Sequence, residues 1–271
     1  MVIYSHSRLS TYEQCPLKFK FRYIDELEEG DSIEAFMGKQ VHETLFFIYT
    51  KVKEKRFPTL HQALIFYKDL WDKEFHQNIK IVKRDLTAKD YFEKGLIFLE
   101  QYYRKHIPFD ENILSMEKRI LIDLEGDGKY MVQGFIDKLI YNEQENVYEI
   151  HDYKTSNWLK SQEELDQDRQ LALYSLGLKD LYPDADKIAL KWYFLKHGVE
   201  KTSFRTNEQL EELKNSIKIL INEIESAQEW PAKKSKLCDW CGFKNRCPAY
   251  QEEIDVESLL RNSEETFINS S

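Results

Sequence analysis

The chain has 271 residues, of which 42% are hydrophobic and 32% charged, and its formal net charge is −9. This length suits one large domain or two smaller ones, and the acidic balance argues against a uniformly basic nucleic-acid binder. No apolar run approaches the ~18 residues of a membrane helix, and the first residues lack the apolar core of a secretory signal. We therefore expect a cytoplasmic protein with no membrane partner.

Helical periodicity dominates the first 110 residues. Apolar residues recur at helical spacing in four segments, the last two rich in aromatic residues: 7–27, 38–55, 59–79 and 88–106. His42 directly follows Val41, a member of the apolar stripe of the second segment. Taken alone, His42 is typical of a structural histidine.

The hydrophobic period then changes from helical to alternating. Three alternating runs, separated by an Asp-Gly turn and the turn NEQEN, predict strands: 113–126, 127–142 and 146–156. A helix follows over 161–182, then a hairpin that turns at His197-Gly198, then a helix over 207–228. The order predicts an α/β fold with a mixed central sheet flanked by helices.

Charged residues gather near the end of the third predicted strand. Asp152 and Lys154 lie two apart, so a strand points both side chains to one face. If the preceding strand pairs with this one, Asp137 approaches Asp152, and two converging carboxylates favour a cation between them. A hard divalent metal meets this requirement, with Lys154 beside it to orient water or steady phosphate charge. Asp-x-Lys alone is more typical of a salt bridge at a strand end.

The four cysteines fall near the two ends of the chain. Cys238, Cys241 and Cys247 form C-x2-C-x5-C, and Cys15 stands apart. Four thiolates complete a zinc site or an iron–sulfur cluster, and the spacing does not choose between them. Three ligands plus an unrelated buried Cys15 is the alternative.

Two local stretches are basic although the chain is acidic, and both contain cysteines. We expect their lysines to lie along the path of a DNA strand, where affinity would depend strongly on salt: Lys18, Lys20, Lys233, Lys234, Lys236 and Lys244.

Six ordered motifs resemble the RecB-like branch of the PD-(D/E)XK nuclease superfamily, in particular its iron–sulfur members such as the AddB nuclease domain and the CRISPR-associated exonucleases. The first three are S-x-L-x-T-Y-E-Q-C-P-x-K-F at 7–19, G-K-x-V-H at 38–42 and G-F-I-D at 134–137. The others are D-Y-K-T at 152–155, Q-L-A-L-Y at 170–174 and C-x2-C-x5-C-P at 238–248. The resemblance covers most of the chain.

The resemblance implies a restriction-endonuclease-like core and a role for each motif. His42, Asp137, Asp152 and the Tyr153 carbonyl would bind Mg²⁺ or Mn²⁺, and Lys154 would activate water or stabilise the transition state. Gln170 and Tyr174 would position DNA or the outer shell of the metal. The cysteines would hold a structural 4Fe–4S cluster: Cys15, Cys238, Cys241 and Cys247. The family often has Glu at the position of Asp152.

Other ionisable residues lie close to these motifs. Glu117 can line the same groove and is a weaker candidate, whereas strand parity places Glu149 away from Asp152, and we expect His151 to face away as well.

Four segments are expected: a helical region with the first cysteine and the histidine motif (1–110), a nuclease core (111–206), a C-terminal helix with the cluster-binding segment (207–250) and an acidic tail (251–271). The favoured function is a metal-dependent DNA exonuclease acting on single-stranded or frayed ends, with a helicase, repair or CRISPR-type complex as partner. A catalytically weak DNA-binding scaffold and a zinc-stabilised interaction protein remain alternatives.

Overall fold

The computed structural model describes residues 2–251, so the expected acidic tail lies outside the described residues apart from Gln251. Its helices, with three short 3₁₀ turns labelled η, are α1 (His6–Gln14), α2 (Pro16–Tyr23), α3 (Ile33–Lys53), α4 (Leu60–Glu74), α5 (Ala88–His106), α6 (Gln162–Asp166), α7 (Arg169–Leu181), α8 (Asn207–Ser226), η1 (Leu195–His197), η2 (Lys236–Trp240) and η3 (Lys244–Arg246). Within these residues, no helix has both the length and the apolar character needed to cross a membrane.

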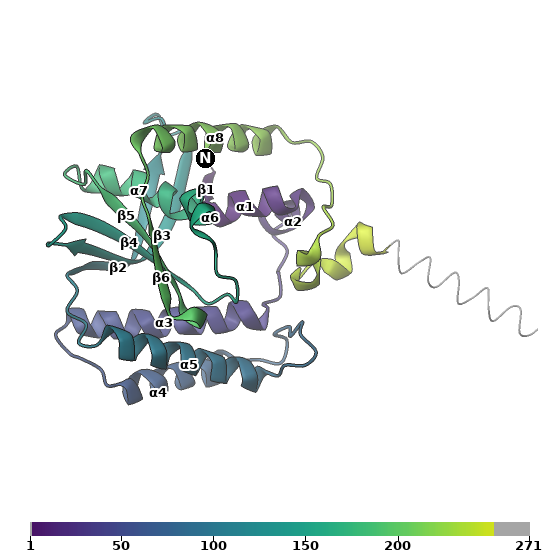
Figure 1. Cartoon of the computed structure of the whole chain (residues 1–271). Helices are drawn as coiled ribbons and strands as arrows, with labels where there is room; N and C mark the ends of the chain where they lie inside the picture. The colour runs from purple at the N-terminus through teal and green to yellow at the C-terminus, as the bar shows by residue number, and fades with distance from the viewer. Residues whose placement is uncertain (1, 252–271) are drawn as a thin grey trace, which may run out of the picture.

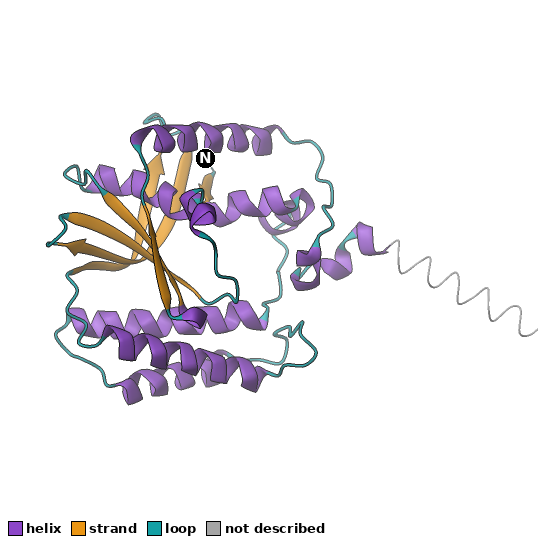
Figure 2. Ribbon diagram, in the orientation of Figure 1, coloured by secondary structure: helices purple, strands orange, loops and turns teal. Residues whose placement is uncertain are grey.

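A six-stranded mixed sheet forms the centre of the molecule (Figures 1 and 2). Its strands are β1 (Ile3–Ser5), β2 (Ile113–Asp123), β3 (Met131–Asn142), β4 (Val147–Lys154), β5 (Ile188–Phe194) and β6 (Val199–Ser203). Strand β3 pairs with β1, β2 and β4, and β5 pairs with β4 and β6. The pairs β1–β3 and β4–β5 are parallel, and the other pairs are antiparallel. The predicted α/β class with a mixed sheet is confirmed.

Helices cover both faces of the sheet, as Figure 1 shows. Helices α1, α7 and α8 pack on one face around a core that includes Leu173 and Trp192. Helices α3, α4 and α5 pack on the other face around an aromatic core that includes Tyr49 and Tyr102. Because helices cover both faces of the sheet, β4 and β5 are buried along almost their whole length.

Two predicted helices are each broken in two. The first breaks at Cys15 because Pro16, the first residue of α2, lacks an N–H and holds the preceding residue in an extended conformation (φ −163°, ψ 107°). The other breaks near Asp168, whose side chain caps α7 by accepting from the Gln170 N–H. Both breaks matter for function, because they place Cys15 outside a helix and Gln170 in the first turn of one. Strand β1 was not predicted.

Candidate active site

Asp137 lies where the pairing of β3 with β4 ends. The last residue pair of this ladder is Lys138 with His151, so the next step along the register sets Asp137 opposite Asp152. The Tyr153 N–H donates to Asp137 Oδ2 at 2.8 Å, which ties the carboxylate to the neighbouring strand. Directly opposite residues of an antiparallel pair have Cβ atoms about 5 Å apart. The pairing that the sequence suggested therefore brings the two aspartates together.

His42 reaches this point from α3. Its Nδ1 lies 3.4 Å from Asp137 Oδ2 and its Nε2 lies 2.9 Å from the Tyr153 carbonyl oxygen. Gly38 lies one helical turn earlier on the same face, and a Cβ there would lie 2.9 Å from Thr155 Oγ1. The absence of a side chain at Gly38 lets α3 pack against the end of β4, which explains the spacing of glycine and histidine in this motif.

Asp152 is buried and held by two side chains. Lys154 Nζ lies 2.7 Å from Asp152 Oδ2 in an ion pair, and Gln170 Nε2 donates to Asp152 Oδ1 at 2.9 Å. Lys154 Nζ also donates to Gln170 Oε1 at 2.8 Å. Gln170, in the first turn of α7, therefore bridges the carboxylate and the ammonium and fixes their relative positions.

Tyr174 lies one turn after Gln170 and serves the packing of this helix. It is buried, and its ring covers Gly134 so closely that a Cβ at that glycine would lie 2.0 Å from the ring. Burial raises the pKa of the Tyr174 phenol to about 12, and a hydrogen bond with Gln170 opposes part of this shift. The glycine of G-F-I-D and the tyrosine of Q-L-A-L-Y thus form one contact.

Glu117 joins the site from β2, where sequence reasoning had ranked it as a weaker candidate. It precedes Lys118, which pairs with Ile136, and its φ of +46° is in the left-handed region that non-glycine residues seldom adopt. His42, Glu117 and Asp137 each offer one ligand atom, and these atoms lie within 4.8 Å of one another. The β2–β3 register, counted from the pair Lys118–Ile136, also sets Glu117 opposite Asp137. This pairing could have identified Glu117 in advance, but the sequence alone does not give the register.

The charges of the site are strongly coupled. Burial alone would lower the pKa of His42, but Asp137 and Asp152 raise it to about 9. Burial raises the pKa of Glu117, and repulsion from Asp137 adds to the shift. Burial also raises the pKa of Asp152, although Lys154 opposes it. Three carboxylates therefore converge on one imidazole, and the donor set favours binding of a cation.

The residues present fit a divalent metal. Asp152 is buried, and the close partner of its Oδ2 is the Lys154 ammonium group at 2.7 Å. Imidazole nitrogen and carboxylate oxygens are ligands for Mn²⁺ and, through oxygen, for Mg²⁺. The group within 4.8 Å contains Glu117 and not Asp152, so an ion shared with Asp152 requires its carboxylate to turn from Lys154 toward Asp137.

Glu149 and His151 take no part in this constellation. His151 Nε2 lies 2.9 Å from Glu149 Oε2, and Lys191 Nζ lies 3.1 Å from the same oxygen. Both residues are buried, and the strand parity that excluded Glu149 from the site agrees with these contacts.

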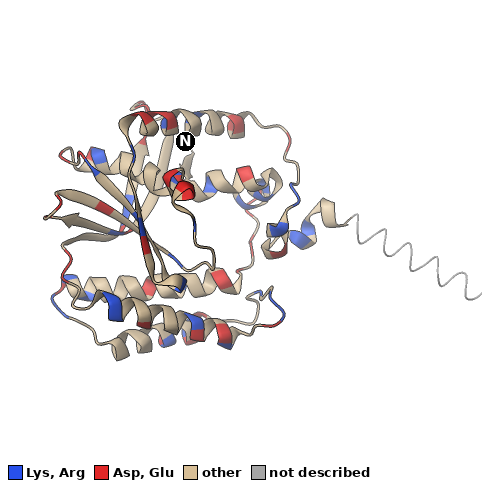
Figure 3. Cartoon of the chain, in the orientation of Figure 1, with Lys and Arg blue, Asp and Glu red and all other residues tan. Residues whose placement is uncertain are grey.

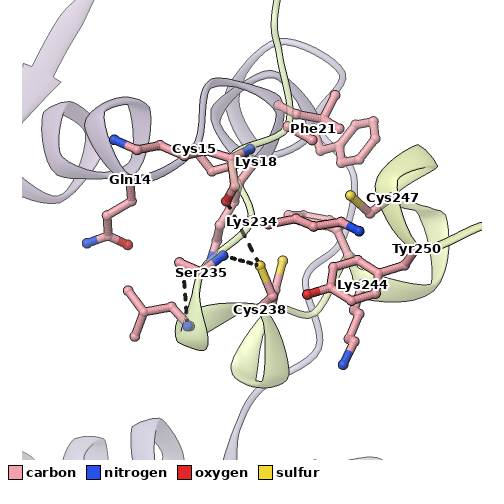
Figure 4. Close-up of a pocket in the computed structure, with 16 residues that line it drawn as sticks. Gln14, Cys15, Lys18, Phe21, Lys234, Ser235, Cys238, Lys244, Cys247 and Tyr250 are labelled. Carbon is pink, nitrogen blue, oxygen red and sulfur yellow. Dashed lines mark hydrogen bonds between the residues drawn. The ribbon is translucent and has the colours of Figure 1, made fainter. Parts of the chain in front are cut away.

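The four cysteines line one cavity, although Cys15 is more than 200 residues from the others in the chain (Figure 4). The Lys233 N–H is directed at Cys15 Sγ at 3.4 Å, and the Ser235 N–H at Cys238 Sγ at 3.3 Å. Amide groups aimed at sulfur suit thiolate ligands, so the donor set fits a metal or cluster held by four cysteines.

Four of the six predicted DNA-binding lysines line this cavity, namely Lys18, Lys233, Lys234 and Lys244, and several of the six have partners. Lys18 pairs with Glu29, Lys20 with Asp25 and Lys244 with Asp239, each at 2.6–2.8 Å. Lys233 Nζ donates to the Glu13 carbonyl oxygen. Lys234 lies over the ring of Tyr250. DNA binding by these five lysines and by Lys236 stays a prediction.

Comparisons with known proteins find two similar solved structures and one matching family model. A solved structure from Eubacterium rectale that carries the name "Putative exonuclease" has 13% identity and a TM-score of 0.50, with 88% of this chain and 92% of that chain covered. The crystal structure of SSO0001 has 15% identity and a TM-score of 0.43, with 89% and 85% covered. A search of curated proteins finds no match. The model of the PD-(D/E)XK nuclease superfamily matches residues 3–248, and the chain therefore belongs to this superfamily, whose restriction-endonuclease-like fold agrees with the sheet and helices described above.

Proposed function

We propose that this PD-(D/E)XK nuclease is an exonuclease of the RecB-like branch that cleaves DNA at single-stranded or frayed ends with Mg²⁺ or Mn²⁺. The superfamily accounts for metal-dependent nuclease chemistry. The observation that carries the proposal is the convergence of His42 and Asp137 on the Asp152–Lys154 pair at the end of β4.

Each side chain has a role that follows from its contacts. His42, Asp137 and Glu117 would hold the cation, with the Tyr153 carbonyl and Asp152 as the remaining protein ligands. A divalent cation held there polarises the scissile phosphate and lowers the pKa of a bound water molecule. Lys154 would donate to the water or to the phosphate oxygens, and Gln170 keeps its ammonium group directed to this side of the sheet.

We further propose that the cysteines hold a 4Fe–4S cluster rather than zinc. The cysteine motifs of the chain resemble those of the iron–sulfur members of the superfamily, and the four cysteines line one cavity. Four thiolates around one cavity suit a cluster in which each thiolate binds a different iron. The cluster would be structural, because Asp137 and Lys154 belong to another part of the fold.

Two other functions predict different results. A scaffold subunit of a repair or CRISPR-type complex would bind DNA without cleaving it, and a zinc-stabilised interaction protein would do neither. The buried Asp152–Lys154–Gln170 group favours the nuclease, because a scaffold gains nothing from an ion pair buried at a strand end. A helicase or another partner would supply the frayed ends.

An assay with blocked substrates tests the proposal. We expect purified protein with Mn²⁺ or Mg²⁺ to degrade end-labelled single-stranded DNA progressively from one end, and EDTA to stop the reaction. Blocking that end should prevent degradation, whereas blocking the other should not. Circular single-stranded DNA cut at the same rate as linear DNA would contradict exonuclease action, and DNA binding without any cleavage would favour the scaffold.

The role of Glu117 gives a separate prediction. In Glu117→Gln the metal concentration for half-maximal cleavage should rise about tenfold or more, because a charged ligand is lost while the shape is kept. Glu43→Gln is the matched control, since Glu43 lines the same cleft and the substitution changes the charge equally. Metal titrations at fixed DNA concentration measure both variants. Equal shifts in the two variants would mean that Glu117 contributes only general charge.

A further inference from the structure

An exposed tryptophan lies in the loop between β4 and α6, directly after the candidate active site. Trp158 is 67% exposed, the neighbouring Leu159 is also exposed, and no aromatic partner for the Trp158 ring occurs within residues 2–251. Four peptide units separate Trp158 from Lys154, so their Cα atoms are at most about 15 Å apart. The indole is therefore within a few nucleotides of the scissile phosphate.

The loop that carries Trp158 is held on both sides. Lys94 Nζ donates to Asn157 Oδ1 at 2.8 Å, and His197 Nε2 lies 3.1 Å from the Asn157 carbonyl oxygen. On the other side, Lys201 Nζ donates to the Lys160 carbonyl oxygen at 2.6 Å. These contacts restrain the backbone on both sides of Trp158, which reduces the entropy lost when a ligand stacks on the indole.

Positive charge gathers beside this loop. Register pairs Lys154 with Phe194, the last residue of β5, so Lys196 in η1 follows at the same edge of the sheet. Lys94 contacts the loop directly through the Asn157 side chain, and His197, the neighbour of Lys196, contacts the carbonyl oxygen of the same residue. Burial lowers the pKa of Lys94, and the charges of Lys196 and Lys83 lower it further. Among residues 2–251, none of the three lies within 4.0 Å of a carboxylate. Figure 3 shows basic residues on α5 and η1 near the loop.

We propose that Trp158 stacks on an unpaired base of the DNA substrate while Lys83 and Lys196 contact its phosphates. This inference rests on the proposed nuclease function and specifies its substrate. A base inside a duplex has no free face, whereas stacking on aromatic side chains combined with a cationic surface is the usual way of holding a single strand. The geometry thus points to single-stranded DNA or a frayed end, held by residues distinct from the lysines around the cysteine cavity.

Binding of fluorescently labelled oligothymidylate, measured by anisotropy in Ca²⁺, tests the stacking. We expect Trp158→Ala to weaken binding about tenfold without changing the salt dependence, and Trp158→Phe to restore most of the affinity. An oligonucleotide with abasic positions should bind wild type and Trp158→Ala alike. The double variant Lys83→Ala/Lys196→Ala should weaken binding to both oligonucleotides and reduce the salt slope by about 0.7 per lysine.

The outcomes separate this inference from the proposed function. A wild-type protein that neither binds nor cleaves DNA overturns the nuclease itself. If wild type cleaves DNA and Trp158→Ala binds oligothymidylate equally well, only the stacking is overturned. The same holds if Trp158→Ala loses equal affinity for the abasic oligonucleotide, since the contact then involves no base. Because Trp158 is exposed, the urea unfolding midpoint of Trp158→Ala should match that of wild type. Equal midpoints exclude misfolding as the cause of a loss of binding.

Discussion

Lys154→Met should reduce DNA cleavage about 100- to 1,000-fold while leaving DNA binding within a few-fold of wild type. The ammonium group of Lys154 lies 2.7 Å from Asp152 Oδ2 and 2.8 Å from Gln170 Oε1, so it is held at the candidate active site, where we propose that it stabilises charge on the phosphate. Removing one preorganised donor at such a position costs a factor of this size. Methionine keeps the length and packing of the side chain and removes only the charge. Single-turnover cleavage with saturating protein measures the loss.

Lys191→Met is the matched control for this experiment. Lys191 also extends from a central strand to a buried carboxylate, with Nζ 3.1 Å from Glu149, and its side chain is 20% exposed compared with 26% for Lys154. Both variants should lose stability, because each leaves a buried carboxylate without its cation. Only Lys154→Met should lose cleavage per folded molecule. Equal activity losses in the two variants would contradict a catalytic role for Lys154 and attribute the effect to stability.

The sequence predicts the site best where chemistry and strand pairing coincide. Asp137 and Asp152 could be brought together in advance, because alternation defines β3 and β4 and the short turn between them sets their register. The motif with Gly38 and His42 could be recognised only by resemblance. The reason for its glycine, the contact with Thr155, depends on how α3 packs on the sheet, and no periodicity in the sequence encodes it.

The features that were not predicted depend on tertiary contacts. Strand β1 has three residues and is defined only by its parallel pairing with β3. Asp168 interrupts a continuous helical pattern, because its side chain caps α7 and pairs with Lys160. The pattern of the sequence does not distinguish such a capping aspartate from one inside a helix. Glu117, which the sequence offers only as a weaker candidate, lies at the site with a backbone conformation (φ +46°) that no sequence pattern predicts. The position of Trp158 depends on hydrogen bonds that hold its loop on both sides. Local sequence patterns thus predict which segments form helices and strands. The ends of these helices and strands, where the candidate site residues lie, are set by tertiary packing.

If the cysteines hold the proposed cluster, Cys15→Ser should remove its iron and open the C-terminal segment to proteases. Within residues 231–251 only Phe243 is buried, and η2 and η3 contain no buried residue. The cluster would therefore serve as the core of this segment, and its binding energy is folding energy. We expect cleavage by protease within 231–251 to become about 100-fold faster, equivalent to ~3 kcal/mol of local stability. Anaerobic iron analysis and limited proteolysis measure the two effects.

A comparison of two cysteine variants decides whether Cys15 is a ligand. If all four cysteines bind one cluster, Cys15→Ser and Cys241→Ser should lose iron and protection from protease to the same extent. If only three bind, Cys15→Ser keeps its metal and Cys241→Ser does not. The contact between α2 and the segment that follows α8 should survive in both variants, because Phe19 stacks on Trp230 and the Leu17 N–H donates to the Pro231 carbonyl oxygen without help from any cysteine. About one zinc per chain in wild type, in place of about four irons, would instead favour the zinc site.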